Sequence, residues 1–229
     1  DVGAMLCADI IGPFTPTVTN KYKYAAVYVS AFGKIVNTYP MKRKSDFTAA
    51  TDHLLLKYRD KGTPVRMFMT DYDPVMRSTQ FRTMASKHGV SVRYSSPYSH
   101  WQNGLIERCI YTLKNKTICN LQQSGLGAEW WYPALSHAAS SHNATPTRTN
   151  PAAASPRNVQ AGRAHTASDG ATSVRDPVDE SFRRAFGCEA YVRREVQKSL
   201  EPRADKCIFL GYADDCADGV YEFVSDRTG

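Results

Sequence analysis

Hydrophobic and polar residues follow two different periods along the first half of the chain. Because β-branched and aromatic residues favour pleated, half-buried surfaces, short runs of them predict β-strands. Such runs occupy residues 4–11, 22–32, 34–42, 65–71 and 90–96. Gly33 separates the second run from the third, which is typical of an antiparallel hairpin.

Between and after these runs, apolar residues recur at intervals of three and four. Ser45 is a suitable N-cap for a helix that continues to about Gly62. Residues 97–104 have the composition of a loop. Further helices are predicted over residues 78–88, 105–123 and 129–143, the last beginning with a Trp130-Trp131 pair that we expect to anchor the core. Strands that alternate with helices favour parallel pairing.

The second half of the chain changes in composition. Residues 145–179 are rich in Ala, Pro, Ser, Thr, Asn and Arg, and they predict a linker or mobile arm. Beyond it, residues 186–193, 206–212 and 219–224 predict three short strands. We therefore expect a catalytic or binding core at 1–144, a linker at 145–179 and a small β module at 180–229.

The composition argues against a membrane protein, a secreted protein and a disulfide-rich protein. The chain has 229 residues, of which 42% are hydrophobic, and no apolar run is long enough to predict a membrane span or a secretion signal. The six cysteines form no C-x-x-C pair and are expected to be buried thiols rather than a disulfide framework or a zinc site. The chain begins at Asp1 without Met, and we expect it to be a segment of a larger protein.

Positive charge is concentrated in one part of the sequence. The net charge is +7, and seven basic residues stand against one acid, Glu107, between Arg77 and Lys116. Clustered Lys and Arg gain affinity for phosphates by releasing counterions, so this tract predicts a polyanionic partner. The alternative is a solvated basic face that binds nothing.

Three acidic residues have positions that suggest a metal site. Asp9 lies inside an apolar strand, Asp71 ends another strand, and Glu107 falls in the first predicted turn of a helix. An ionised carboxylate is costly to bury unless its charge is compensated, and Mg²⁺ prefers oxygen ligands. Two such ions on either side of a phosphate would activate the attacking oxygen and stabilise the leaving one.

The sequence around these acids resembles a known family. Asp71 and Glu107 are separated by 35 residues, and residues 97–108 read PYSHWQNGLIER, with Thr112-Leu113 following. Asp9 precedes Gly12-Pro13, and Thr70-Asp71 is followed at the expected interval by Phe81. These blocks resemble the D,D-35-E motif of retroviral and LTR-retrotransposon integrases. Downstream, FGCEAY at 186–191 and KCIFLGY at 206–212 are similar to runs in copia-type polyproteins.

The resemblance implies an α/β, RNase H-like core with a mixed five-stranded sheet flanked by helices, which agrees with the predicted strands. It also implies a Mg²⁺-dependent (or Mn²⁺-dependent) integrase, with two ions, that processes the 3′ ends of element DNA and joins them to target DNA. The implied partners are double-stranded DNA and further copies of the chain, with a cytoplasmic particle before integration in the nucleus. A zinc-binding domain would precede Asp1. The implied ligands are Asp9, Asp71 and Glu107, and the implied DNA contacts are Gln102, Asn103, Arg108, Tyr111, Lys114 and Lys116.

Departures from the family pattern leave alternatives open. Residues 72–76, Tyr-Asp-Pro-Val-Met, replace the usual Asn-Gly-Gly-Glu-Phe beside the second Asp, which puts catalytic activity in doubt. Asp73 is either a substitute ligand or a solvated turn residue, of which the solvated turn residue is expected. Tyr111 either stacks on a base or packs, and packing is expected. The rival functions are a catalytically lapsed DNA-binding or assembly module and another RNase H-like nuclease. Residues 212–215 mimic a reverse-transcriptase YxDD turn, but only fourteen residues follow them.

Overall fold

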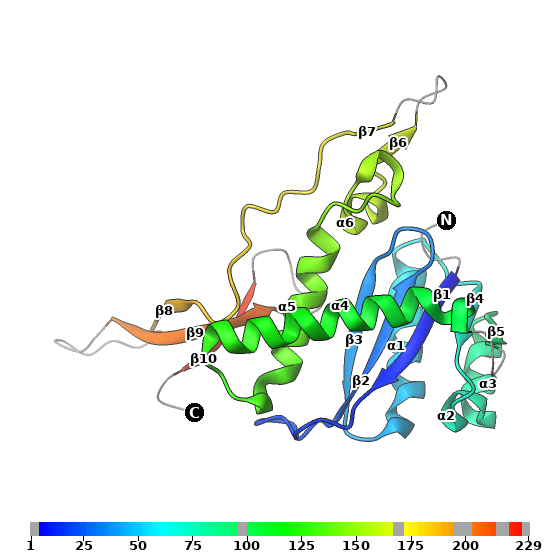
Figure 1. Ribbon diagram of the computed structural model, residues 1–229, viewed down its shortest axis with the longest axis horizontal. Coiled ribbons are helices and arrows are strands. Elements are labelled where there is room, and N and C mark those ends of the chain that lie inside the picture. The colour runs from blue at the N-terminus through cyan, green and yellow to red at the C-terminus, as the bar shows by residue number, and fades with distance from the viewer. Residues whose placement is uncertain (1–4, 96–99, 167–171, 195–202, 214–219, 226–229) are drawn as a thin grey trace.

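A mixed sheet of five strands forms the centre of the molecule. The computed structural model describes residues 5–95, 100–166, 172–194, 203–213 and 220–225 (Figure 1). The strand order is β3-β2-β1-β4-β5, in which β1 pairs antiparallel with β2 and parallel with β4. The predicted mixed sheet is therefore confirmed. Its strands are β1 (Met5–Ile11), β2 (Tyr24–Ser30), β3 (Val36–Met41), β4 (Met67–Thr70) and β5 (Ser91–Tyr94).

Helices cover both faces of this sheet. In Figure 1, α4 runs across the front of strands β1 to β3 and α1 lies behind them. One face packs against α1 (Phe47–Asp60), α2 (Pro74–Arg77) and α3 (Thr79–Lys87). The other packs against α4 (His100–Ser124) and α5 (Trp131–Ala144), which the 3-10 turn η2 (Ala128–Trp130) precedes.

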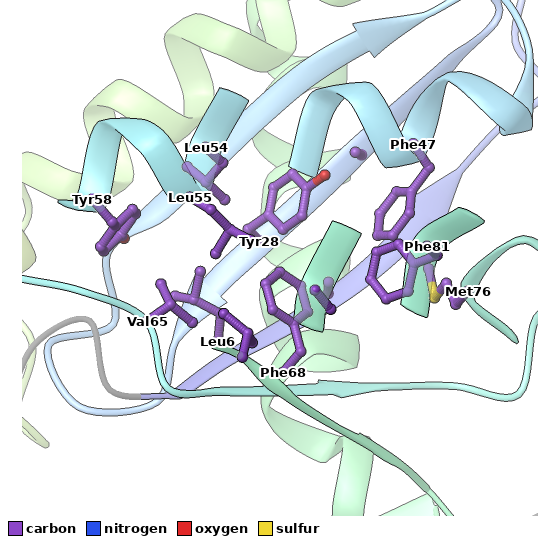
Figure 2. Close-up of a cluster of buried hydrophobic side chains, with 14 of the residues drawn as sticks. Leu6, Tyr28, Phe47, Leu54, Leu55, Tyr58, Val65, Phe68, Met76 and Phe81 are labelled. Carbon is purple, nitrogen blue, oxygen red and sulfur yellow. The ribbon is translucent and has the colours of Figure 1, made fainter. Parts of the chain in front are cut away.

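The alternation of side chains in β1 explains why both faces are covered. Successive side chains of a strand point to opposite faces. Leu6 and Ala8 join the core under α1 and α3, whereas Cys7 and Ile11 join the core under α4 and α5. Figure 2 shows the first core, where the Phe68 ring lies edge-on to Tyr28 and Phe81.

Two helix boundaries differ from the predicted ones. The 3-10 turn η1 (Lys44–Asp46) precedes α1, so the N-cap of α1 is Asp46 and the assignment to Ser45 was wrong. Helix α4 begins at His100 rather than at 105, so the predicted loop was wrong for residues 100–104, and residues 97–99 lie outside the described chain. The helix continues back from Leu105 and Ile106, which pack in the core, through this stretch of loop-like composition.

Helix α2 was not predicted, although its local chemistry is clear. Pro74 occupies the first turn, where a missing N–H costs nothing. The Asp73 carboxylate accepts a hydrogen bond from the Val75 N–H at 2.9 Å and so caps the helix. At four residues, the helix is too short for hydrophobic periodicity to detect.

Helix α5 completes the hydrogen bonding of an edge strand. The Asn143 amide accepts from the Val36 N–H and donates to the Val36 carbonyl, both at 2.8 Å. Strand β3 ends the sheet, so these bonds satisfy backbone groups that would otherwise lack a partner strand. Asn150, after α5, donates to the Gly33 carbonyl at 3.1 Å and ties the following segment to the same hairpin.

The rest of the chain contains short elements. Residues 145–179 include η3 (Pro151–Ala153), α6 (Pro156–Gln160) and an antiparallel pair of strands, β6 (Ala164–Thr166) and β7 (Thr172–Val174). The three predicted C-terminal strands are present as β8 (Glu189–Arg193), β9 (Ala204–Tyr212) and β10 (Tyr221–Ser225), in the order β10-β9-β8. The proposed domain boundaries stay a prediction.

Helix α5 also supports the C-terminal sheet. The His137 ring stacks on Tyr212 with centroids 6.0 Å apart, and its Nε2 lies 3.0 Å from the Arg184 carbonyl. Burial lowers the pKa of His137, which favours the neutral ring in this aromatic environment. The small β module is therefore packed on the core.

Cysteine burial follows the prediction only in part. Cys7, Cys109 and Cys207 are buried free thiols, but Cys119 is an exposed free thiol, so the prediction was wrong there. Cys216 lies outside the described residues. Among the described helices, none is long and apolar enough to cross a membrane.

We expect Phe68→Ala to lower the free energy of unfolding by about 3–5 kcal/mol, because it opens a cavity in a close-packed aromatic cluster. Phe68 is fully buried. The control Phe32→Ala removes a ring that is 52% exposed and should change stability by less than about 0.5 kcal/mol. Urea unfolding measures both, and equal effects would contradict this description of the core.

Candidate functional site

Strand pairing brings Asp9 and Asp71 together. In the parallel pair of β1 and β4, Ala8 lies opposite Thr70, the last residue of β4, so Asp9 in β1 and Asp71 just after β4 occupy the next positions. Neighbouring strands lie about 5 Å apart. Asp9 shares the face of Cys7 and Ile11, and Asp71 that of Met69, which packs in the same core. Both carboxylates therefore belong to the face of the sheet that α4 covers.

The loop after β4 is held by a chain of hydrogen bonds. Asp71 Oδ1 accepts from the Asp73 N–H at 3.2 Å. Asp73 in turn accepts from Val75 through Oδ1 and from the Lys44 ammonium through Oδ2, at 3.0 Å. Asp73 is thus neither fully solvated nor isolated, and it lies in the electrostatic field of the aspartate pair.

Burial and like charges disfavour the ionised form of Asp9. Burial is the largest cause, and with the charges of Asp71 and Asp73 it raises the Asp9 pKa to about 6. The Ile10 N–H, 2.6 Å from Asp9 Oδ1, and the Lys114 ammonium act in the opposite direction. A cation bound beside Asp9 would remove this penalty.

The pKa of Asp71 is likewise raised by some neighbours and lowered by others. Burial raises its pKa first, and the charge of Asp73 raises it further. The Asp73 N–H and the Lys44 ammonium lower it. Burial and neighbouring negative charge therefore disfavour the ionised form of both aspartates. The surrounding N–H and ammonium groups offset part of this effect.

Helix α4 presents a mixed polar face beside these acids. Its buried face consists of Ile106, Cys109, Ile110, Leu113 and Thr117. Glu107, Tyr111, Lys114 and Ile118 follow one another at spacings of four, three and four residues, and all are exposed. Tyr111 is 69% exposed, so the expectation that it packs in the protein was wrong.

The predicted DNA contacts differ in accessibility. Arg108, Tyr111 and Lys114 are exposed, whereas Lys116 is half-buried and burial lowers its pKa. The side chains of Gln102 and Asn103 lie outside the described part of the structure. Three of the six predicted contacts are therefore available on one helix.

Glu107 was predicted as the third metal ligand. It is exposed, and the α4 charge that acts on Asp9 is that of Lys114. Within the described residues, no group of three or more Asp, Glu, His or Cys side chains is placed to hold a metal ion. The role of Glu107 stays a prediction.

An apolar groove of about 290 Å³ adjoins Lys114. Phe14 and Trp131 line it with rings 4.7 Å apart, and the indole N–H donates to the Thr15 carbonyl at 2.8 Å. Trp131 is buried, as expected for a core anchor. The groove runs from Ile11 and Lys114 toward Leu121 in the C-terminal half of α4.

The unusual loop residues pack on their neighbours. The Arg77 guanidinium lies 4.1 Å from the centre of the Tyr72 ring, and the centre of the Tyr94 ring lies 5.7 Å from it. Tyr94 donates to the Met76 carbonyl at 2.9 Å. The loop at residues 72–76 is thus held against its neighbours by these ring, cation–π and hydrogen-bond contacts. Sequence spacing gave no signal for the Lys44 contact, which joins residues 29 positions apart.

Comparisons with known proteins agree with this architecture. No protein-family profile matches the sequence. The sequence is 23% identical over 214 residues to the retrovirus-related Pol polyprotein from transposon TNT 1-94 of Nicotiana tabacum. That match covers 92% of this chain and 15% of the relative, so the chain spans about 15% of the relative's length.

Solved structures decide the fold. The catalytic core domain of HTLV-2 integrase, in complex with magnesium, matches with a TM-score of 0.52 and 18% identity, over 69% of this chain and 96% of that chain. The chain has the fold of an integrase catalytic core. A simian T-cell lymphotropic virus intasome in complex with PP2A regulatory subunit B56 gamma matches over 97% of this chain and 76% of that chain, with a TM-score of 0.53 and 16% identity. The integrase resemblance read from the motifs is confirmed.

We expect Asp9→Asn to stabilise this integrase-like core near neutral pH in metal-free buffer. Asp9 holds its proton up to about pH 6 in the folded chain, against an ordinary value of 3.8. Between these values the folded state binds more protons than the unfolded state, so stability falls as pH rises. Removing the charge should recover about 2–3 kcal/mol at neutral pH.

Urea unfolding from about pH 4 to about pH 7 tests this expectation. The matched control is Asp60→Asn, because the Asp60 side chain is 72% exposed. If Asp9→Asn showed the same pH slope as the wild-type chain, burial would not govern the ionisation of Asp9.

Proposed function

We propose that this chain is the core of a polynucleotidyl transferase that processes retroelement DNA 3′ ends and joins them to target DNA. The observation that carries the proposal is the placement of Asp9 beside Asp71, on the α4 face of an integrase-core fold. The polyprotein match supports a retroelement origin. The copia-type blocks at 186–191 and 206–212 narrow the proposal to that class.

The residues present fit a divalent metal. Asp9 and Asp71 offer oxygen donors, and burial together with neighbouring negative charge makes a nearby cation favourable. We propose that they hold Mg²⁺ or Mn²⁺ and that Glu107 completes the ligand set. When bound, two ions would activate the attacking oxygen and stabilise the leaving oxygen. The HTLV-2 core was solved in complex with magnesium, which supports this choice of metal.

The chain itself binds and orients the DNA in this proposal. Lys114 and Arg108 are exposed on α4 and offer cations for phosphates next to the carboxylates. Tyr111 is exposed on the same helix and offers a ring on which a base can stack. Gln102, Asn103 and Lys116 are proposed as further DNA contacts.

Assembly and location are part of the same proposal. The HTLV-2 core has been described in trimeric and dimeric forms, and the simian virus relative as an intasome. We propose that this chain also acts as a homo-oligomer on double-stranded DNA, in a cytoplasmic particle first and in the nucleus for integration.

A second candidate function is a catalytically lapsed DNA-binding or assembly module. The packed loop at residues 72–76 favours it, because Asp73 is engaged by Lys44 next to the metal-binding pair. In that case the chain would bind duplex DNA without nicking or joining it. The activity measurement below separates the two candidates.

We expect Asp71→Asn to lower DNA nicking and strand joining by at least about a hundredfold, because loss of a metal ligand removes several kcal/mol of transition-state stabilisation. The assay combines the purified chain, Mg²⁺ or Mn²⁺ and a labelled duplex with the element-end sequence. Asp60→Asn, which changes an exposed acid, should retain full activity. A wild-type chain that binds this duplex without cutting it would support the lapsed module instead.

Metal binding has a readout apart from activity. We expect Mn²⁺ to raise the unfolding midpoint of the wild-type chain, since a ligand at a hundred times its Kd adds about 2.7 kcal/mol. Asp9→Asn and Asp71→Asn should show no metal-dependent rise, and Glu107→Gln should show a reduced one. Glu129→Gln serves as the control, and an unchanged rise in Asp71→Asn would exclude Asp71 as a ligand.

A further inference from the structure

Lys44 and Asp73 form an ion pair beside the two aspartates. Lys44 begins the 3-10 turn η1, and its Nζ lies 3.0 Å from Asp73 Oδ2. The Lys44 side chain is 48% exposed, whereas that of Asp73 is only 14% exposed. The carboxylate is therefore enclosed, and the ammonium faces solvent as well as its partner.

Hydrogen bonds fix the position of this ammonium relative to Asp71. The second oxygen of Asp73 caps α2 by accepting the Val75 N–H, and the Asp73 N–H donates to Asp71 Oδ1. A lysine side chain normally loses considerable rotamer freedom when it binds a ligand. Because Asp73 already restrains Lys44, less of that freedom remains to be lost when a further anion binds.

The ion pair leaves donor capacity for another anion. An ammonium group carries three N–H donors, and one of them points at Asp73. An ion pair exposed to this degree contributes little to stability, so folding alone gives a weak reason for it. Its half-exposed position suits an additional negatively charged ligand.

Lys44 also has a counterpart on the other side of the sheet. Lys44 is linked to Asp71 through Asp73, whereas Lys114 is exposed on α4. Lys44 directly precedes α1, which packs on one face of the sheet, and Lys114 belongs to α4, which packs on the other. The site thus has one ammonium group from each of the two helical layers.

We infer that Lys44 contacts a DNA phosphate adjacent to the one that reacts at Asp9 and Asp71, and that Asp73 is the residue that positions it. This inference rests on the proposed function, since it assumes that DNA passes over the aspartate pair. It adds a contact outside the basic tract between Arg77 and Lys116. The two lysines would hold the strand on both sides of the reacting phosphate.

The test is duplex binding by the full chain, measured by fluorescence anisotropy across a series of salt concentrations. Lys44→Ala should weaken binding about fivefold to tenfold near 0.1 M salt and reduce the salt slope by about one, as expected for one lost phosphate contact. Lys44→Arg should restore most of the affinity, because the charge is kept. Lys61→Ala is the matched control, since Lys61 is exposed at the far end of α1.

A double-mutant cycle with Asp73→Asn tests the positioning role. If Asp73 holds Lys44 in place, Lys44→Ala should cause a smaller loss of affinity in the Asp73→Asn background than in the wild-type background. An equal loss in both backgrounds would refute the positioning role. Melting curves for each variant confirm that the proteins compared are folded.

The outcomes separate the inference from the proposed function. Binding by Lys44→Ala that equals binding by Lys61→Ala, with the same salt slope, would overturn the contact at Lys44 and leave the proposed function standing. A wild-type chain that binds no duplex at any salt concentration would overturn both.

Discussion

Parallel pairing of β1 with β4 places two carboxylates side by side, and the organisation of the site follows from that constraint. Asp9 and Asp71 cannot separate without breaking the register in which Ala8 faces Thr70. In this partly buried setting the charge of Asp71 disfavours the ionised form of Asp9. Backbone N–H groups and two lysines offset the repulsion without removing it. A cation that binds at such a site is stabilised by the two carboxylates, and a phosphate that binds there is stabilised by the cation.

The sheet tolerates this repulsion because the same strand is packed on both faces. Leu6 and Ala8 anchor β1 to one helical layer, and Cys7 and Ile11 anchor it to the other. Just beyond the strand, Gly12 has a φ of +119°, and a Cβ there would lie 2.6 Å from the Lys23 carbonyl oxygen. Only glycine fits this turn. The spacing of Asp9 and Gly12 in the motif therefore has a steric reason as well as a chemical one.

Sequence periodicity predicted the strands and most helices because burial on fixed faces leaves a regular pattern. The proximity of Asp9 and Asp71 did not follow from periodicity alone. It was predicted from their places at the predicted strands together with the spacing of the family motif. The Lys44 contact to Asp73 depends on the distance between two loops, which no local pattern encodes. The start of α4 was misplaced because Gln102, Asn103 and Gly104 have loop composition although they lie within the helix. Exposure of Tyr111 was missed because an aromatic residue on a helix usually packs.

The axial position of α4 decides what this helix contributes to the aspartate pair. Its rotation is set by the buried stripe from Ile106 to Leu113, which turns Glu107, Tyr111 and Lys114 to one side. Glu107 and Lys114 are seven residues apart, so they occupy nearly the same direction about 10 Å apart along the axis. With Lys114 in the field of Asp9, the helix supplies a positive charge to a negative pair. Glu107 precedes Lys114 by two turns on this side of the helix, so its proposed role as third ligand depends on the axial position of α4 as well as on the spacing of 35 residues.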